Sequence, residues 1–180
     1  MSMYDDVKGI LVSEAELKAC VQKLGAQITK DYEGKNLLLV SVLRGSVIFM
    51  ADLMSEIKIP CTIDFMSVSS YGSGTKSSGV VKIIKDLDLN LAGYDILIVE
   101  DILDSGNTLA YLKKMLLTRN PSSIKICTLL DKPERRTADI SADYSGFSIP
   151  DAFAVGYGLD YNEKYRNLPF IGVLDPKIYE

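Results

Sequence analysis

The chain of 180 residues contains no histidine and no tryptophan, and it has only three cysteines. Without histidine, a Ser-His-Asp triad, imidazole acid–base catalysis and most catalytic zinc sites are excluded. Any proton transfer must therefore use a carboxylate, lysine, tyrosine or water. Cys20, Cys61 and Cys127 lie far apart in apolar patterns, without the spacing of metal ligands or of a disulfide framework. We expect them to be buried, reduced thiols of a cytoplasmic protein.

Long apolar runs, a basic surplus and sequence repeats are also missing. No apolar stretch approaches the roughly 20 residues that span a bilayer, and the first residues do not resemble a signal peptide. The formal net charge of −4 argues against a nucleic-acid binder, which usually carries a basic surplus. We therefore expect one domain, residues 1–180, in the cytoplasm, with neither a membrane nor a nucleic acid as its partner.

Apolar strands alternate with amphipathic helices along the chain. Ser13 and Glu16 form the pattern of a capping box, which predicts a helix from there to about Asp31. Further helices are predicted at residues 47–57 and 107–118, and strands at residues 36–42, 61–68, 80–84, 95–99, 123–130, 153–157 and 170–174. This alternation predicts an α/β fold with a mainly parallel central sheet flanked by helices, which binds ligands at the carboxyl ends of its strands.

The most informative segment is Ile-Leu-Ile-Val-Glu-Asp-Ile-Leu-Asp-Ser-Gly-Asn-Thr-Leu, residues 96–109. Its apolar start predicts a buried parallel strand. The turn after it offers backbone N–H groups and hydroxyls at a helix N-terminus, which suits a phosphate. Glu100 and Asp101 would repel phosphate, so they suit sugar hydroxyls, a metal ion or a proton. The segment predicts a sugar-phosphate site, and Asp104 is also placed to cap the helix at Asn107.

Residues 99–108 resemble the ribose-phosphate signature of the type I phosphoribosyltransferases. Residues 43–45, 130–132 and 155–163, followed by Arg166, narrow the resemblance to the hypoxanthine (hypoxanthine-guanine) phosphoribosyltransferases. The motifs follow the family's order from about residue 7 onward. The resemblance implies the family's fold, in which a small C-terminal hood, mainly residues 146–180, covers the site.

The resemblance assigns roles to the ribose-phosphate and pyrophosphate residues. Glu100 and Asp101 would contact the ribose hydroxyls, directly or through Mg²⁺, and Asp104 would exchange a proton with the purine N7. The 5′-phosphate would bind to the turn formed by Asp104, Ser105, Gly106, Asn107 and Thr108. Pyrophosphate would bind to Arg44, Gly45 and Arg166, and family members carry a cis peptide bond in the loop at Arg44.

The resemblance also assigns the purine, metal and lid residues. The purine would contact Lys132, Phe153, Ala154 and Asp160, and Lys132 would donate to a 6-oxo group. Asp160 would bind a second magnesium ion, in addition to the one at Glu100 and Asp101. Ser70 and Tyr71 would form the tip of a lid within the Ser- and Gly-rich segment 67–79, which otherwise would be a plain connector.

The implied activity transfers the 5-phosphoribosyl group of phosphoribosyl pyrophosphate to hypoxanthine and to guanine, giving IMP or GMP and pyrophosphate. The implied assembly is a homodimer or homotetramer. Two alternatives stay open: a phosphoribosyltransferase for xanthine or a pyrimidine, and a regulator of the same fold that binds nucleic acid. The roles of Glu100 and Asp101 depend on where their strand ends. Neighbouring residues of a strand face opposite sides, so both carboxylates can reach one ligand only if the strand has already ended there.

Overall fold

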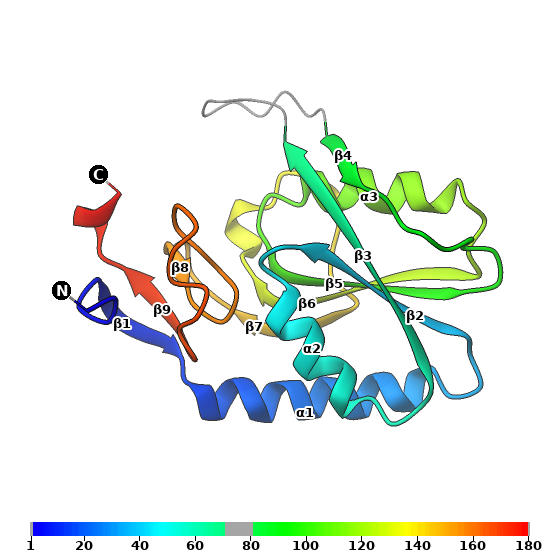
Figure 1. Ribbon diagram of the computed structural model, residues 1–180, viewed down its shortest axis with the longest axis horizontal. Helices are drawn as coiled ribbons and strands as arrows, with labels where there is room; N and C mark the ends of the chain where they lie inside the picture. Colours follow the sequence, from blue (N-terminus) through cyan, green and yellow to red (C-terminus); the bar gives the residue numbers. More distant parts are fainter. Residues whose placement is uncertain (1, 71–80, 180) are drawn as a thin grey trace.

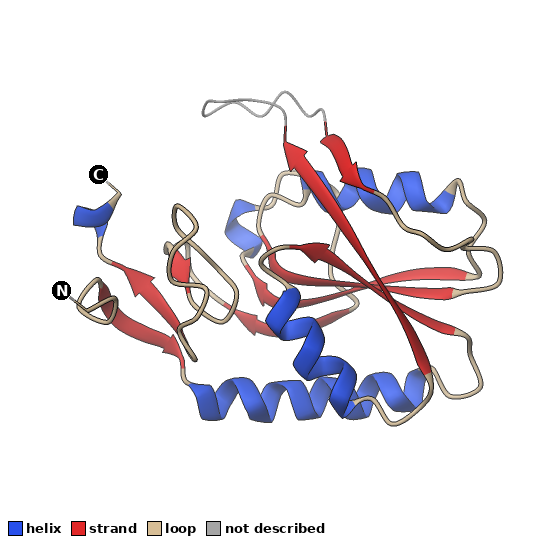
Figure 2. Ribbon diagram, in the orientation of Figure 1, coloured by secondary structure: helices blue, strands red, loops and turns tan. Residues whose placement is uncertain are grey.

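The computed structural model describes residues 2–70 and 81–179. Its centre is a six-stranded sheet in the order β4-β3-β2-β5-β6-β7 (Figures 1 and 2). The strands are β2 (Leu37–Leu43), β3 (Cys61–Ser70), β4 (Val81–Lys85), β5 (Asp95–Leu103), β6 (Ser123–Asp131) and β7 (Tyr144–Ser148). All neighbours are parallel except β3 and β4. The predicted mainly parallel α/β sheet is confirmed.

Helices cover both faces of this sheet, because its central strands β2 and β5 carry buried apolar side chains on both sides. Helices α1 (Glu14–Asp31) and α2 (Val47–Glu56) lie on one face and α3 (Asn107–Leu117) on the other (Figure 1). Along β2, Leu37 and Leu39 join the apolar cluster of α1 and α2, while Leu38 and Val40 join the cluster of α3. This alternation fixes the register of the central strand between two cores.

The predicted elements agree closely with the observed ones at the starts of the helices. Ser13 caps α1, since its hydroxyl accepts from the Glu16 N–H and the Glu16 carboxylate accepts from the Ser13 N–H at 2.8 Å. The largest difference is in β5, which continues four residues beyond the predicted end, to Leu103. That extension decides which way the site carboxylates point.

A second, three-stranded antiparallel sheet forms the hood, in the order β1-β9-β8. Its strands are β1 (Val7–Val12), β8 (Ala154–Val155) and β9 (Ile171–Leu174), so it joins the two ends of the chain (Figure 1). The sequence analysis did not predict β1 or β7. A small apolar cluster containing Val155, Leu168 and Leu174 stabilises the hood.

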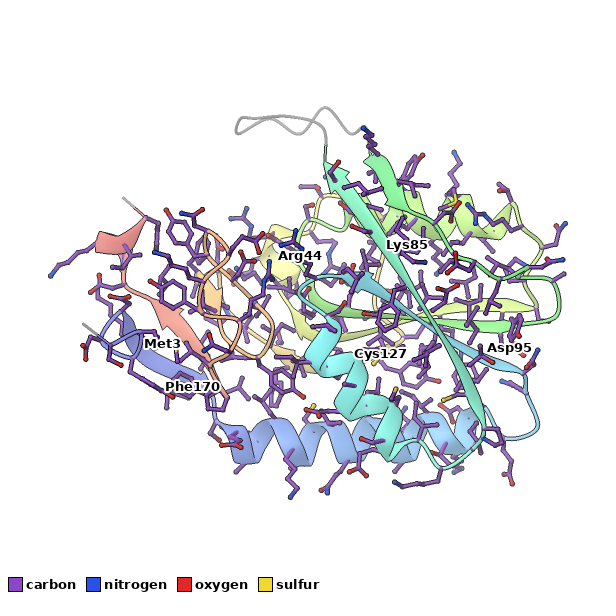
Figure 3. All side chains as sticks on the ribbon, viewed as in Figure 1. Met3, Arg44, Lys85, Asp95, Cys127 and Phe170 are labelled. Atoms are coloured by element: carbon purple, nitrogen blue, oxygen red, sulfur yellow. The ribbon has the colours of Figure 1, made fainter. Side chains whose placement is uncertain are left out.

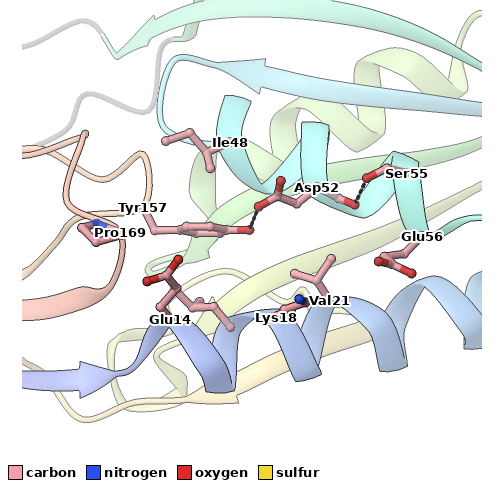
Figure 4. A pocket seen from close by; sticks show the side chains of 10 residues that line it. Glu14, Lys18, Val21, Ile48, Asp52, Ser55, Glu56, Tyr157 and Pro169 are labelled. Carbon is pink, nitrogen blue, oxygen red and sulfur yellow. Dashed lines mark hydrogen bonds between the residues drawn. The ribbon is translucent and has the colours of Figure 1, made fainter.

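Tyr157 connects the hood to helix α2 by a hydrogen bond. Its hydroxyl donates to the Asp52 carboxylate of α2 at 2.5 Å (Figure 4). This contact borders a cavity of about 370 Å³ between α1, α2 and the hood segment that carries Pro169. None of the predicted site residues lines that cavity.

The cysteines are free thiols, of which Cys127 is buried and Cys20 and Cys61 are partly buried. Burial raises the pKa of the Cys127 thiol, so it stays protonated at neutral pH. Within the described part of the chain, no helix is both long and apolar enough to cross a membrane.

Candidate active site

The predicted site residues follow three neighbouring parallel strands. Arg44 follows β2, Asp104 follows β5 and Lys132 follows β6, and these strands are adjacent in the sheet. Their carboxyl ends therefore meet at one edge, as expected for a ligand site in an open α/β sheet. The hood covers this edge, because Gly158 packs so closely that a Cβ added there would clash with the carbonyl oxygen of Gly45.

The turn after β5 encloses a small cavity of about 110 Å³ at the start of α3. The N-cap of α3 is Gly106, at a φ of 82° that suits glycine, and the N–H of Asn107 donates to the Ser105 hydroxyl at 3.4 Å rather than to Asp104. The expected capping role of Asp104 is therefore wrong. The cavity is lined by Glu100, Ile102, Leu103, Asp104, Ser105, Gly106, Thr108 and Leu109. The Asn107 side chain points elsewhere, since its amide donates to Thr137 at 3.2 Å.

Arg136 holds this turn in place, although the sequence analysis did not single it out. Its guanidinium donates to the carbonyl oxygens of Leu103 at 3.2 Å, Asp104 at 2.9 Å and Ile140 at 2.8 Å, and it pairs with Asp131. These contacts satisfy backbone carbonyls at the end of the strand and so fix the conformation of the turn.

Glu100 and Asp101 face opposite sides because β5 continues past them. Glu100 lines the cavity at the start of α3. Asp101 lies against the loop after β2, where a Cβ added to Gly45 would clash with its Oδ2. The condition that the strand ends before both carboxylates is not met, so one faces the predicted phosphate turn and the other the predicted pyrophosphate loop.

Both carboxyls have raised pKa values. Burial, reinforced by the neighbouring Asp101 charge, raises the pKa of Glu100 well above its ordinary value. Burial raises the pKa of Asp101 to about 6, while the Ile102 N–H and the Arg166 cation oppose the rise. Raised pKa values of neighbouring buried carboxyls are typical of functional sites.

Two of the predicted pyrophosphate residues, Arg44 and Arg166, contact the same carboxylate, that of Glu163. Arg44 Nη1 donates to Glu163 Oε2 at 2.8 Å, and Arg166 Nη2 contacts the same oxygen at 3.3 Å. Arg166 also pairs with Asp160 at 2.9 Å, and its Nε is buried without a hydrogen-bond partner among residues 2–70 and 81–179. The peptide bond between Leu43 and Arg44 is cis, and Arg44 lies between the main sheet and the hood (Figure 3).

A cavity of about 330 Å³ contains the predicted purine residues. Lys132 is buried there, and its ammonium donates to the carbonyl of Ala152 at 2.7 Å. Phe153 contributes an aromatic surface and stacks on Tyr179 with 5.0 Å between ring centroids. The cavity is lined by Ile102, Asp104, Lys132, Arg135, Asp151, Ala152, Phe153, Ala154, Leu159 and Asp160. Arg135 and Asp151 were not predicted.

The structure gives less information on the predicted metal ligands and on the predicted lid residues. Across the described residues, no three acidic or thiol side chains converge as a preformed metal site. Mg²⁺ usually binds one or two carboxylates together with substrate oxygens, so Asp101 and Asp160, whose charges interact, fit it. Glu100 lines the cavity on the other side of the strand and does not join them. Ser70 ends β3, and Tyr71 lies outside the described residues.

Comparisons with known proteins agree with this geometry. The phosphoribosyl transferase domain family matches residues 10–162. The chain belongs to this family. It is 56% identical over 178 residues to the hypoxanthine-guanine phosphoribosyltransferase of Bacillus subtilis, covering 99% of both proteins. It also matches the Listeria monocytogenes bifunctional protein TilS/HprT at 53% identity, covering 99% of this chain but only 28% of that relative's length.

Solved structures of the family have the same fold. A hypoxanthine phosphoribosyltransferase from Staphylococcus aureus superposes with a TM-score of 0.97 at 52% identity, covering 99% of this chain and 97% of the other. The hypoxanthine phosphoribosyltransferase from Trypanosoma cruzi, as a mutant in a ternary substrates complex, superposes with a TM-score of 0.93 at 43% identity, covering 98% and 100%. The type I phosphoribosyltransferase fold is confirmed.

Proposed function

We propose that the protein is a purine-salvage hypoxanthine phosphoribosyltransferase, which transfers the 5-phosphoribosyl group of phosphoribosyl pyrophosphate to hypoxanthine and to guanine. The observation that carries the proposal is the convergence of three sites at one sheet edge. Asp104 lines both the phosphate cavity and the purine cavity, and Asp160 of the purine cavity pairs with Arg166 of the arginine pair. Relatives that match over nearly their full length are named hypoxanthine-guanine phosphoribosyltransferase, which supports the proposal.

In the proposed reaction, the bond between the ribose C1′ and the pyrophosphate oxygen breaks, and a bond from C1′ to a purine nitrogen forms. Arg44 and Arg166 bind the departing pyrophosphate. Asp101 or Asp160 would hold Mg²⁺, which would supply further positive charge for the leaving group. Glu100 accepts from the ribose hydroxyls. The turn of Ser105, Gly106, Asn107 and Thr108 binds the 5′-phosphate.

The purine cavity explains the choice of base. The Lys132 ammonium has three hydrogens and gives one to Ala152. A 6-oxopurine accepts another, whereas the 6-amino group of adenine would place a donor against a buried donor. Phe153 stacks on the ring, Ala154 and Asp160 border its edge, and the Asp104 carboxylate takes or returns the N7 proton.

The test is product formation from phosphoribosyl pyrophosphate with hypoxanthine, guanine, xanthine, adenine or uracil, each offered separately. We expect rapid formation of IMP and GMP that stops on chelation and resumes with Mg²⁺. Asp104→Asn should lower kcat with hypoxanthine at least about 100-fold, while the exposed control Asp139→Asn should not. Turnover of xanthine or uracil alone would contradict the assigned substrate. Binding of phosphoribosyl pyrophosphate without any turnover would contradict the enzyme itself.

Location in the cytoplasm and assembly into a homodimer or homotetramer stay predictions from the sequence and its resemblance. Size-exclusion chromatography with light scattering on the purified protein would measure the assembly directly.

A further inference from the structure

Four charged side chains alternate in sign across the purine cavity. Arg135 Nε donates to Asp104 Oδ1 at 2.8 Å, and its Nη1 contacts the two Asp151 oxygens at 3.3 and 3.2 Å. Asp151 Oδ1 in turn lies 3.6 Å from the Lys132 ammonium. All four residues line the cavity. Arg135 therefore connects the carboxylate beside N7 to the lysine beside the 6-oxo group.

The surroundings of Arg135 indicate a role in binding rather than in folding. Its side chain is 50% exposed, and those of Asp104 and Asp151 are 41% and 51% exposed. Ion pairs this exposed contribute little to stability. The backbone of Arg135 is nevertheless fixed, because it ends the short 3₁₀ turn Pro133–Arg135 directly after the buried Lys132.

We propose that Arg135 is a positioning residue for the purine, an inference that rests on the proposed function. Its contact with Asp104 Oδ1 restrains a half-exposed carboxylate and leaves Oδ2 to meet the N7 proton. Its contact with Asp151 holds that carboxylate beside Lys132. The ammonium, directed by Ala152 and Asp151, then presents its third hydrogen to the 6-oxo group.

The proposal makes Arg135 act on the base and not on the sugar phosphate. The residues that line the phosphate cavity all lie between positions 100 and 109, so they do not include Arg135. Loss of the guanidinium should therefore weaken interactions with hypoxanthine and IMP. Interactions with phosphoribosyl pyrophosphate and ribose 5-phosphate should be unchanged.

The chain offers a matched control for an exposed arginine–aspartate pair. Arg119 donates to both Asp86 oxygens at 2.8 and 2.7 Å, and neither residue lines the phosphate or purine cavity. Arg119→Gln removes the same kind of ion pair without touching the site. Arg135→Lys keeps the charge but cannot hold both carboxylates in the planar geometry of a guanidinium.

The kinetic test compares Arg135→Gln, Arg135→Lys, Asp151→Asn and Arg119→Gln with the unaltered protein. We expect Arg135→Gln to lower kcat/KM for hypoxanthine about 10- to 100-fold, with a KM for phosphoribosyl pyrophosphate within about twofold of the original. Arg135→Lys should recover part of the loss, and Asp151→Asn should reproduce a smaller part of it. Arg119→Gln should change neither constant. Unchanged hypoxanthine kinetics in Arg135→Gln, or a loss confined to phosphoribosyl pyrophosphate, would overturn the proposal.

A binding test works without turnover and separates this proposal from the proposed function. Calorimetry with IMP and with ribose 5-phosphate compares a ligand that has the purine with one that lacks it. We expect Arg135→Gln to weaken IMP about 10-fold and leave ribose 5-phosphate unchanged. Equal weakening of both ligands, or of neither, would contradict a role in purine positioning. Inactivity of the unaltered protein would count against the proposed function alone.

Discussion

The variant Asp101→Asn tests whether the buried Asp101 carboxylate lowers the stability of the folded protein while it serves the active site. Asp101 Oδ1 accepts from the Ile102 N–H at 2.7 Å, and its Oδ2 lies over Gly45. Asparagine has the same shape and keeps the acceptor, so the substitution removes little besides the charge. Burial is the main reason why the pKa of Asp101 rises to about 6.

The sign and size of the stability change follow from this pKa. Its ordinary value is 3.8, so between pH 3.8 and about 6 the folded protein binds more protons than the unfolded chain. The free energy of unfolding therefore falls as the pH rises through this range. Each pKa unit corresponds to about 1.4 kcal/mol, so above about pH 7 the raised pKa of Asp101 lowers the free energy of unfolding by on the order of 3 kcal/mol. Asparagine carries no such penalty.

Urea denaturation between about pH 4 and about pH 8, in a buffer with chelator, measures this prediction. We expect Asp101→Asn to be as stable as the unaltered protein near about pH 4 and more stable at about pH 7.5, by up to about 3 kcal/mol. Asp139→Asn, at an exposed position, should show no pH-dependent difference. A stability difference that stays constant with pH, or a variant that is less stable in the neutral range, would refute burial as the cause. Transferase activity should fall in the same variant that gains stability.

Two further substitutions test the contact between hood and loop and the shared carboxylate. Gly158→Ala places a methyl group against the carbonyl oxygen of Gly45 at a φ of 103°, so thermal denaturation should show a loss of about 2 to 4 kcal/mol. Gly93→Ala has a similar φ of 83° in open space and should lose only about 1 kcal/mol; equal losses would contradict the steric argument. Glu163→Gln removes the carboxylate shared by the two arginines, so the KM for phosphoribosyl pyrophosphate should fall about two- to fivefold. An increased KM would show instead that Glu163 helps to bind the substrate.

The middle of the central sheet could be predicted because its strands are buried on both faces. A run such as Leu37–Leu43, in which only Ser41 is polar, leaves no other position in a domain of this size. The missed strands lack that signal. In β1 (Val7–Val12) most side chains are exposed or only partly buried, and its partner β9 lies near the opposite end of the chain. The edge strand β7 (Tyr144–Ser148) buries only Tyr144 fully, so neither periodicity nor length distinguishes it from a loop.

Site residues that directly follow a strand, such as Asp104 and Lys132, could be predicted from the sequence. Charged residues within turns, such as Arg135 and Arg136, were missed. Arg135 and Arg136 belong to a polar stretch that would be typical of any solvated turn. Their roles depend on which backbone carbonyls and carboxylates lie opposite, and the fold alone determines that. Their adjacency, shortly after the predicted purine lysine Lys132, was the one available signal.

The pair Glu100 and Asp101 illustrates how one strand end can serve two subsites. Side chains alternate along a strand, and β5 remains a strand through Leu103. Adjacent carboxylates are therefore separated by the sheet itself, one beside the turn of α3 and the other beside Gly45. In the proposed reaction, the ribose 5-phosphate binds on the side of Glu100 and the pyrophosphate binds on the side of Asp101. The bond that breaks joins these two groups. Two neighbouring residues of one rigid strand can thus hold both parts of the substrate in fixed relative position, which loop residues of separate elements would do less precisely.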